Sequence, residues 1–484
     1  MTAPLVSPKD SSLDHPYSGP YDLLLIKLLL YPAIGFFVFG TLVGAFLSVN
    51  GYVLPDYFSG EYITFGRIRP MHVASVALLW LLSADLGLMF YFVPRLCCTR
   101  VYAPRVAMTG IALWWFSTVI GTFSFPFATN SGWEYAELPM WLGFLPIKLI
   151  SAVGFVLIAF SLLGTILTRT RQQLYVSLWY TIATLLWTAL TYVFGNFWVE
   201  MVPGGISRIN VNYFYVHNLV GLIFTPMGLA TAYFFLPKFA NRPIYSHTLS
   251  LIGFWSIAFF YPWIGAHHII HGPISQWLQT VSIVFSIWLF IPVWSVIVNL
   301  FGTMRGHWNS YSHSAPLRFL LMGVLFYLMV CIQGPLMALR NINEITSKTD
   351  WIIGHAHMAL YGTFTFFAIA GIYWVIPVLA QREIWSRRLA DWHFNLSLLG
   401  GLLMFTSLFI GGFMQGLEWS NWATGGSYFQ FQLNLAKLPF IETVAQQVHV
   451  WKLRSLSGIL IATATILFAT NLVNTLLIPA KEEA

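Results

Sequence analysis

The sequence from Trp351 to Met358 reads Trp-Ile-Ile-Gly-His-Ala-His-Met, and it opens an apolar run that continues to about residue 379. A run of this length can cross a bilayer, which takes about 20 residues of helix. His355 and His357 lie two positions apart inside it. Two residues correspond to a rotation of about 200° on a helix, so the two imidazoles leave opposite sides. We therefore expect one membrane helix to offer a ligand to each of two flat cofactors.

The composition of the whole chain is typical of a polytopic membrane protein. Of the 484 residues, 57% are hydrophobic and only 8% are charged, whereas about a quarter of the residues in soluble domains are charged. No polar stretch is long enough for a soluble domain, so we expect one integral membrane domain over residues 1–484. The net charge of +7 comes from basic residues between apolar runs. These are topological signals, and we expect no nucleic-acid partner.

Hydropathy and length predict an all-α fold of about twelve transmembrane helices. Basic residues concentrate in the links after every second span, which the positive-inside rule assigns to the cytoplasm. An even number of spans brings both termini to that same side. The N-terminal segment does not resemble a secretory signal peptide, so we expect the first span to be retained. The predicted spans are 23–49, 71–94, 106–127, 140–168, 174–200, 212–236, 249–271, 275–302, 316–339, 351–379, 394–416 and 455–478.

Six histidines lie inside these spans or near their outer ends, where ionisable groups are costly and by default functional. A hydrogen-bonded core histidine would explain any single one of them. Six together, with few membrane carboxylates to pair with, favour ligation of haem iron or copper, both of which imidazole suits. All six are predicted in the outer half of the bilayer. They are His72, His217, His267, His268, His355 and His357.

Four motifs contain these histidines: Arg69-Pro70-Met71-His72, Tyr215-Val216-His217-Asn218, Tyr261 with His267-His268 after five intervening residues, and Asp350-Trp351-x-x-Gly354-His355-Ala356-His357. In this order and at these spacings they resemble the catalytic subunit (subunit I) of the cbb3-type cytochrome c oxidases, which are C-family haem-copper oxygen reductases. The resemblance covers almost the whole chain. Two departures indicate a divergent branch: Gln333 replaces a glutamate, and Ser347 stands about where the family has a histidine near the haem propionates.

The resemblance implies the fold of haem-copper oxidase subunit I and two haem b groups. His72 and His357 would be the axial ligands of a low-spin haem, and His355 would be the proximal ligand of a high-spin haem. The division agrees with ligand chemistry. Two histidines leave no open position and suit electron transfer, whereas one histidine leaves a position for substrate.

The same resemblance implies a copper ion held by His217, His267 and His268, opposite the high-spin haem. In the family, the tyrosine that matches Tyr261 is covalently linked to a copper-ligating histidine, here His217, and supplies an electron and a proton when the oxygen bond breaks. Tyr261 precedes His268 by seven residues. On a continuous α-helix that spacing is two turns, so we expect both side chains on one face.

Protons must reach this site from the cytoplasm through a dry interior, which requires polar side chains and water. Tyr233 on the sixth span, with Ser250 and Tyr261 on the seventh, lies in that direction. Similar positions form the proton channel of the family, and we expect these three residues to serve the same purpose.

Arg69 and two glutamates are the candidates for contacts with the haem propionates. Arg69 lies three residues before His72, and its guanidinium suits a carboxylate in charge and shape. Glu134 and Glu137 lie in the following outer loop. The cbb3-type and nitric-oxide-reductase families hold a calcium ion between propionates, so either glutamate is a candidate oxygen ligand for calcium.

The expected function is that of a terminal respiratory oxidase, which reduces dioxygen to water and couples the reaction to proton uptake and translocation. The nearest alternative is a nitric oxide reductase large subunit, in which a non-haem iron takes an extra glutamate four residues after the histidine of the sixth span. Here that position is Gly221, which offers no oxygen ligand. A transporter would typically show broken helices and a repeat, and a purely electron-carrying haem protein would not need the His267-His268 pair.

Electrons need an entrance that this chain does not contain. It has three cysteines and no Cys-x-x-Cys-His motif for a c-type haem. The resemblance therefore implies partner subunits that carry c-type haems, a soluble or membrane-bound cytochrome c as donor, and a location in the bacterial inner membrane.

Overall fold

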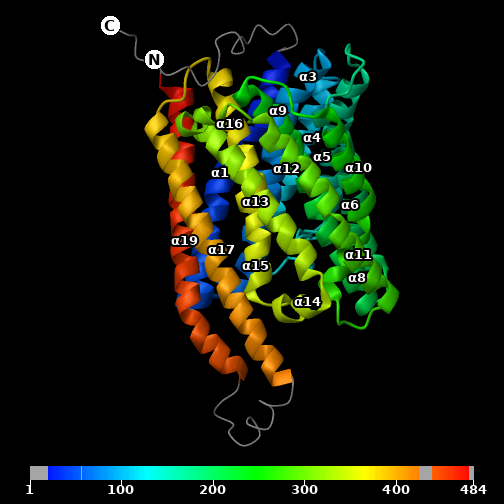
Figure 1. The fold of residues 1–484 in the computed structure, drawn as a ribbon, viewed down its shortest axis with the longest axis vertical. Helices are drawn as coiled ribbons and strands as arrows, with labels where there is room; N and C mark the ends of the chain where they lie inside the picture. Colours follow the sequence, from blue (N-terminus) through cyan, green and yellow to red (C-terminus); the bar gives the residue numbers. More distant parts are fainter. Residues whose placement is uncertain (1–19, 56, 424–438, 479–484) are drawn as a thin grey trace, which may run out of the picture.

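The structure of the protein is a computed structural model that describes residues 20–55, 57–423 and 439–478 (Figure 1). The described residues form a bundle of helices, with one isolated β-bridge between Leu142 and Leu145. Twelve helical stretches among them are long and apolar enough to cross a membrane. The predicted all-α, polytopic fold is therefore confirmed.

Most spans consist of one α-helix, and several are interrupted or extended by short π-helical or 3-10 segments. The α-helices are α1 (Pro20–Ser48), α2 (Phe65–Ala74), α3 (Ser83–Cys97), α4 (Pro104–Phe123), α5 (Ile147–Leu167), α6 (Val176–Val193), α7 (Val199–Met201), α8 (Ile206–Asn218), α9 (Thr225–Ala240), α10 (His247–Phe260), α11 (Gln276–Trp288), α12 (Phe290–Thr303), α13 (Ala315–Met337), α14 (Arg340–Thr346), α15 (Asp350–His357), α16 (Phe366–Ala380), α17 (Arg387–Ala423) and α19 (Pro439–Leu477). The π-helical segments are η1 (Val49–Val53), η3 (Ser75–Leu82), η5 (Phe194–Trp198), η6 (Leu219–Phe224) and η10 (Met358–Thr365). The 3-10 segments are η2 (Glu61–Ile63), η4 (Phe125–Phe127), η7 (Tyr261–Trp263), η8 (Gly265–Ile269) and η9 (Trp308–His313).

Three spans form the centre of the bundle. In Phe65–Cys97, 89% of the most apolar stretch is buried, and in Ile206–Ala240 and Asp350–Ala380 the share is 94%. The other nine spans bury 39% to 61% of theirs. A helix that is apolar on all sides is typical of such an interior position, whereas the outer helices turn one side to lipid.

Each central span changes from α-helix to π-helix shortly after a candidate ligand. The segment η3 begins three residues after His72, η6 begins two residues after His217, and η10 begins directly after His357. A π turn closes hydrogen bonds over five residues rather than four and occurs frequently at functional sites. The helical phase therefore shifts between the candidate ligands and the other half of each central span.

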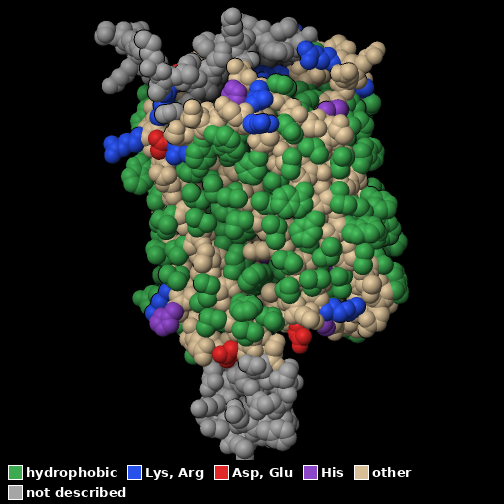
Figure 2. Space-filling model, viewed as in Figure 1, with side chains coloured by type: hydrophobic (Ala, Val, Ile, Leu, Met, Phe, Trp, Pro, Cys, Tyr) green, Lys and Arg blue, Asp and Glu red, His purple; other side chains and the backbone are tan. Residues whose placement is uncertain are grey.

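The surface agrees with a membrane protein. Hydrophobic side chains cover the middle of the visible face, and charged side chains gather toward its two ends (Figure 2). The start of α1 and the end of α19 lie at one end of the bundle, and α14 lies at the opposite end, which we call the α14 end (Figure 1).

The last two spans differ from the prediction in length. The predicted ranges were 394–416 and 455–478, but α17 runs from Arg387 to Ala423 and α19 begins at Pro439. The two helices pack along each other. A Cβ atom at Gly400 would meet Ile461, and one at Gly411 would meet Gln447. Because side-chain packing between the two helices stabilises turns beyond the apolar stretch, hydropathy underestimates the length of both helices.

Candidate functional site

One internal cavity of about 570 Å³ lies among the central spans and is lined by all six candidate histidines, which are His72, His217, His267, His268, His355 and His357. Its volume falls in the range of about 300–1,000 Å³ that is usual for ligand and cofactor pockets. The histidines come from α2, α8, η8 and α15, so four separate segments of the chain converge on one space.

The rings of His72 and His357 face each other across this cavity. Their centroids are 6.4 Å apart and their planes differ by 18°. Two imidazoles that bind one metal from opposite sides, with metal–nitrogen distances of about 2 Å, have centroids about 6 Å apart. The pair therefore fits the two axial positions of a haem iron.

Hydrogen bonds fix the orientation of both rings. The Nδ1 atom of His72 lies 2.8 Å from the carbonyl oxygen of Gly40, and Nδ1 of His357 lies 2.8 Å from that of Ile353. A metal-ligating histidine usually bonds its second ring nitrogen in this way. Gly44 allows the close approach of α1, because a Cβ atom there would lie 2.6 Å from the His72 ring. The Nε2 atoms of the two histidines are left to face the cavity.

His355 contacts a different neighbour, as the two-residue spacing in α15 predicts. Its Nδ1 atom lies 3.3 Å from the side-chain oxygen Oε1 of Gln333 on α13. Gly334 leaves room beside the ring, since a Cβ atom there would be 3.7 Å from His355. His355 therefore has one nitrogen bonded to the protein and the other available to an iron.

The other three histidines form a compact cluster. One potential ligand atom from each of His217, His267 and His268 lies within 4.8 Å of the other two. The Nδ1 atom of His267 is bonded to Ser286 Oγ at 2.8 Å, and the His268 ring stacks on Tyr213 at 5.3 Å. His217 is buried, and its Nδ1 atom has no hydrogen-bond partner among the described residues. A cluster of three imidazoles with one such buried nitrogen fits a copper ion with an open position.

Tyr261 lies beside this cluster, but not by the helical geometry that the sequence predicts. The prediction that Tyr261 and His268 share one face of a continuous helix is wrong, because α10 ends at Phe260 and two 3-10 segments follow. Pro262 lacks the amide hydrogen that an α-helix needs and clashes with the preceding turn. The Tyr261 ring nevertheless contacts His217, with ring centroids 4.6 Å apart.

Gly221 of η6 lies directly against Tyr261. A Cβ atom at Gly221 would lie 1.6 Å from Tyr261 Cε1 and 1.9 Å from Cζ. No side chain fits here while Tyr261 keeps its position. A glutamate at residue 221 and a tyrosine ring at residue 261 therefore exclude each other in this packing.

Tyr233 and Ser250 form hydrogen bonds with residues other than Tyr261. The hydroxyl oxygen of Tyr233 accepts a bond from Asn299 Nδ2 at 3.4 Å, and its ring stacks on Tyr180 at 5.9 Å. The Ser250 hydroxyl donates to the His247 carbonyl oxygen at 2.6 Å. Among the described residues, no direct hydrogen bond joins Tyr233, Ser250 and Tyr261. Water would have to complete a proton path between them.

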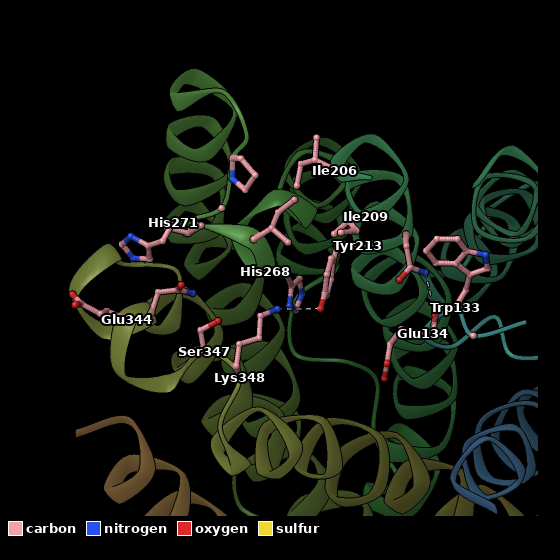
Figure 3. A pocket seen from close by; sticks show the side chains of 17 residues that line it. Trp133, Glu134, Ile206, Ile209, Tyr213, His268, His271, Glu344, Ser347 and Lys348 are labelled. Atoms are coloured by element: carbon pink, nitrogen blue, oxygen red, sulfur yellow. Dashed lines mark hydrogen bonds between the residues drawn. The ribbon is translucent and has the colours of Figure 1, made fainter. Parts of the chain in front are cut away.

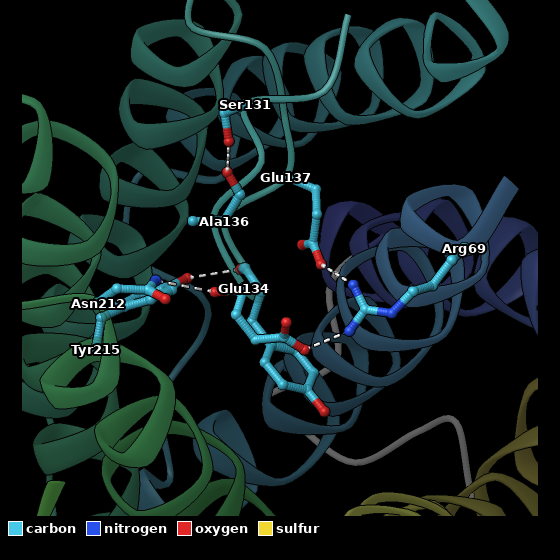
Figure 4. Close-up of polar contacts among 8 residues, drawn as sticks. Arg69, Ser131, Glu134, Ala136, Glu137, Asn212 and Tyr215 are labelled. Carbon is cyan, nitrogen blue, oxygen red and sulfur yellow. Dashed lines mark hydrogen bonds and ion pairs between the residues drawn. The ribbon is translucent and has the colours of Figure 1, made fainter. Parts of the chain in front are cut away.

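Arg69 lies between Glu134 and Glu137 (Figure 4). Its guanidinium pairs with the Glu134 carboxylate, and Nη1 lies 4.0 Å from Glu137 Oε1. Burial raises the pKa of the Glu137 carboxyl to about 7, although the charge of Arg69 opposes this rise. The two glutamates thus face a guanidinium. A calcium cage takes about six to eight oxygen ligands, and within the described residues this pair belongs to no group of three candidate metal ligands. The side chains alone do not fit a calcium ion.

The start of α15 is anchored by Asp350, which is buried. Its Oδ2 atom accepts hydrogen bonds from Trp451 Nε1 at 2.9 Å and from Gln415 Nε2 at 3.1 Å. The Asp350 amide donates back to Gln415 Oε1 at 2.8 Å. Gly412 permits this close packing, since a Cβ atom there would lie 2.0 Å from Trp351 N. Helices α17 and α19 thereby set the position of the segment that carries His355 and His357.

Sequence reasoning missed two cations that line the cavity, Arg454 of α19 and Lys348 between α14 and α15. The Arg454 guanidinium lies 4.4 Å above the Tyr52 ring, and its buried Nη1 atom has no hydrogen-bond partner in the described part of the chain. Each could have been recognised in the sequence as a basic residue near the end of a predicted span, on the outer side of the membrane, where acidic residues predominate in the links.

A third missed residue is Asp85 of α3, which is fully buried. One carboxyl oxygen lies 3.4 Å from Thr231 Oγ1, and the other has no partner among the described residues. In the sequence Asp85 could have been recognised as a single carboxylate inside the predicted span 71–94.

Comparison with known proteins agrees with this geometry. The sequence model of the family described as "Cytochrome C and Quinol oxidase polypeptide I" matches residues 25–460. A "Cytochrome c oxidase subunit 1 homolog" from Azorhizobium caulinodans is 29% identical over 469 residues, which cover 94% of this chain and 82% of that protein. A "Cbb3-type cytochrome c oxidase subunit CcoN1" from Stutzerimonas stutzeri is 31% identical over 394 residues, with 80% of each chain covered.

A solved structure described as a heme-copper terminal oxidase dimer has a similar fold. The TM-score is 0.75, the sequence identity is 14%, and the match covers 96% of this chain and 86% of the other. At this identity the likeness bears on the fold alone.

Proposed function

The chain belongs to the cytochrome c and quinol oxidase polypeptide I family, and from this premise we propose that it is the subunit of a terminal respiratory oxidase in which dioxygen is reduced to water. It is a haem-copper oxidase, with relatives that include a cbb3-type subunit. The proposal adds the substrate, the electron donor and the assignment of individual residues. The whole of residues 1–484 would act as one integral membrane domain.

The observation that carries the proposal is the convergence of His217, His267 and His268 beside the ring of Tyr261. Three imidazoles suit a copper ion and leave it open to a substrate. The facing pair His72 and His357 supplies a separate site for a haem with both axial positions filled. A haem protein that only carried electrons would not need the second group of ligands.

The residues of this chain would divide the work as follows. His72 and His357 would hold a low-spin haem b, His355 a high-spin haem b, and the three clustered histidines a copper ion. When bound, these groups supply electron transfer and the redox chemistry of dioxygen. The apolar walls of the central spans keep bulk water out.

Tyr261 and two further polar residues would handle protons. The hydroxyl group of Tyr261 would hold a proton next to His217 and release it toward the substrate. Tyr233 and Ser250 would pass protons from the cytoplasm with the help of ordered water, because no direct hydrogen bond joins the three side chains in the described residues. Proton uptake and translocation would thus proceed along α9 and α10, which carry Tyr233 and Ser250.

The packing of Gly221 against Tyr261 argues against the alternative function of a nitric oxide reductase. That function would need a hard oxygen ligand beside the metal, and position 221 has no room for one while Tyr261 is in place. The same contact favours oxygen chemistry, because the missing side chain at Gly221 leaves room for the Tyr261 ring beside His217.

Three cations would balance the carboxylates of the two haem groups. Arg69 and Arg454 line the cavity near the His72 pair, since Arg69 is one helical turn from His72 and Arg454 lies above Tyr52 of η1. Lys348 lines the same cavity. A calcium ion is not part of this proposal, because Glu134 and Glu137 belong to no group of three candidate metal ligands among the described residues.

The proposed location is the bacterial inner membrane, with the α14 end outside and both termini in the cytoplasm. The positive-inside rule supports this orientation, because links with several arginines lie at the end opposite α14. Partner subunits with c-type haems would dock at the α14 end and receive electrons from a soluble or membrane-bound cytochrome c.

Metal and haem analysis of the purified complex tests the proposal. We expect two haem b groups and one copper ion per copy of this chain, together with oxygen consumption driven by reduced cytochrome c. The variant His217→Ala should lose copper and oxygen consumption and keep the low-spin haem spectrum. Non-haem iron in place of copper, with nitric oxide consumption, would establish the alternative instead.

A further inference from the structure

The haem and metal cavity ends partway along the three central spans, on the side away from α14. Each of these spans has a last residue that lines the cavity, and the three are Leu81, Thr225 and Thr365, which we call the floor. Beyond the floor the spans continue as α3, α9 and α16. These helices separate the cavity from the opposite end of the bundle.

At the α14 end the cavity is bounded differently. It adjoins a second cavity of about 810 Å³, and Tyr213 and His268 line both (Figure 3). The haem and metal cavity therefore has a way out toward the α14 end. A proton that arrives from the opposite end must instead cross the floor.

Asp85 of α3 lies about one helical turn beyond this floor. It follows Leu81 by four residues, which is about 6 Å along a helix axis. Its side chain is fully buried. Helical side chains tilt toward the N-terminus of their helix, and the N-terminal end of α3 faces the cavity. The carboxyl group therefore tilts toward the floor.

The Asp85 carboxyl group has one polar contact among the described residues. Its Oδ1 atom lies 3.4 Å from Thr231 Oγ1 on α9, and its Oδ2 atom has no partner there. No basic nitrogen of the described chain lies within 4.0 Å of it. An ionised carboxylate is very costly in such a place, so the group holds its proton and is neutral.

The helices that pack against α3 place no charge at this level. They are α1, α5, α6, α9 and α16. Because a dry interior screens charge weakly, the protonation of Asp85 responds to charge changes in the cavity about one turn away. The charged residues of the five helices lie within about two turns of a helix end, and they are Asp22, Lys27, Lys148 and Lys238.

The three central spans contain two acids, Asp85 and Asp350. The Asp350 carboxylate accepts hydrogen bonds from Trp451 and Gln415 and anchors α15. Asp85 is therefore the acid of these spans that has an oxygen without a donor and a place next to the floor.

Asp85 is also separate from the route through Tyr233 and Ser250. Thr231 and Tyr233 are two residues apart on α9, a rotation of about 200°, so their side chains leave opposite sides of the helix. Tyr233 contacts Asn299 of α12, whereas Thr231 contacts Asp85 of α3. The two routes approach the cavity from different sides of α9.

We propose that Asp85 is a proton-holding group that takes protons from the side away from α14 and passes them across the floor into the haem and metal cavity. Thr231 is its positioning partner. The acid O–H bond breaks as the proton passes to a water molecule at the floor. The carboxylate then takes a new proton from the opposite side, so the cycle leaves Asp85 unchanged. The inference rests on the proposed function, because oxygen reduction in the cavity consumes the protons.

Infrared difference spectra between the oxidised and reduced states of the purified complex test this role. A protonated carboxylic acid absorbs apart from ionised carboxylates and amides, and only groups that change between the two states contribute. We expect such a band in the wild type, shifted in heavy water and shifted again when the aspartate side chains carry an isotope-labelled carboxyl group. Asp85→Asn should lose the band, and Thr231→Val should shift it because a hydrogen bond is removed.

Asp391→Asn is the matched control, because Asp391 lies on the surface of α17 and pairs with Arg318. The band should remain in this variant. Proton uptake gives a second readout, measured with a pH-indicating dye after oxygen is added to the reduced complex. It should slow by about 100-fold in Asp85→Asn, the lower end for a positioned proton donor, and keep the wild-type rate in Asp391→Asn.

A wild-type complex with its haems and copper but without a band from a protonated aspartate would overturn the proposal, and this result needs no variant. A band that persists in Asp85→Asn, or wild-type proton uptake in that variant, would overturn it as well and leave Asp85 a structural acid. A wild-type complex without two haems and a copper ion per chain would instead refute the proposed function.

Discussion

The Nδ1 atom of His355 lies 3.3 Å from the side-chain oxygen of Gln333, so the candidate proximal ligand is supported by a neutral amide. An amide oxygen accepts a hydrogen bond from the imidazole but bears no full charge and holds no proton. A carboxylate at the same position would accept a stronger bond and give the imidazole more electron density. Gln333 therefore keeps the geometry of the ligand and limits its electron donation.

Gln333→Glu should lower the potential of the high-spin haem and make turnover depend on pH where the new carboxyl titrates. Gln333→Met, which removes the hydrogen bond at similar volume, should lower turnover by about tenfold, within the range for partners of metal ligands. Redox titration measures the change in potential. Turnover measured from about pH 5 to about pH 9 covers the pKa range of a buried carboxyl and of an imidazole and measures the pH dependence. Unchanged potential and pH profile in Gln333→Glu would show that residue 333 has no such role.

Gly221→Ala should displace Tyr261 from His217. The added methyl group would overlap the Tyr261 ring, so the metal cluster loses its neighbour and turnover should fall by about 100-fold, at the upper end for positioning residues. The low-spin haem spectrum should remain. Gly35→Ala on α1 is the control, because a Cβ atom there meets nothing within 4 Å. Equal turnover in the two variants would contradict the packing argument.

The two groups of histidines should be separable by substitution. His72→Ala should remove the low-spin haem signal, because a single remaining histidine cannot give bis-histidine ligation. His217→Ala should instead remove copper and keep that signal. His247→Ala is a control on the exposed start of α10. Absorption spectra and metal content measure all three, and loss of both signals in both variants would mean that the sites are not independent.

Asp350→Ala should loosen α15. The substitution leaves Trp451 Nε1 and Gln415 Nε2 without their acceptor, and hydrogen bonds to a charged group contribute about 1.5–3 kcal/mol each. We expect a loss of stability of about 2–4 kcal/mol, with weaker retention of haem. Asp350→Asn keeps an acceptor oxygen and should cost less. Thermal unfolding in detergent, followed by haem absorption, gives the comparison, and equal unfolding temperatures for wild type and Asp350→Ala would disprove the anchoring role.

Hydropathy predicts the number of spans well because burial in lipid demands long apolar helices. It fails at the ends of α17 and α19, where helix pairing and not lipid stabilises the polar turns. Local spacing correctly separates His355 from His357, since both lie in one regular helix. The same reasoning fails for Tyr261 and His268, because the helix is interrupted after Phe260 by Pro262.

The ion pairs and hydrogen bonds of the site were beyond prediction for a different reason. Arg69 meets Glu134 over 65 positions of sequence, and Lys348 meets Tyr213 over 135. Nothing in the spacing of these residues indicates contact, because the packing of separate spans brings them together. The sequence indicates which residue types are available, and the bundle decides which of them pair.

The π-helical segments in the three central spans mark the places where these helices can absorb the loss of one residue. A π turn contains one residue more than the α turn it replaces. Deletion of a single residue in η3, η6 or η10 can therefore be absorbed as ordinary α-helix without breaking the span. The turns on either side of the π segment would keep their relative phase, because the π turn and the α turn that replaces it both make one full rotation. A deletion in the regular α-helical part of the same span would instead rotate one side by about 100° and shift it by about 1.5 Å. The histidines would then fall out of register with the rest of the span, so the place of a deletion, and not only the remaining hydrophobicity, decides whether function survives.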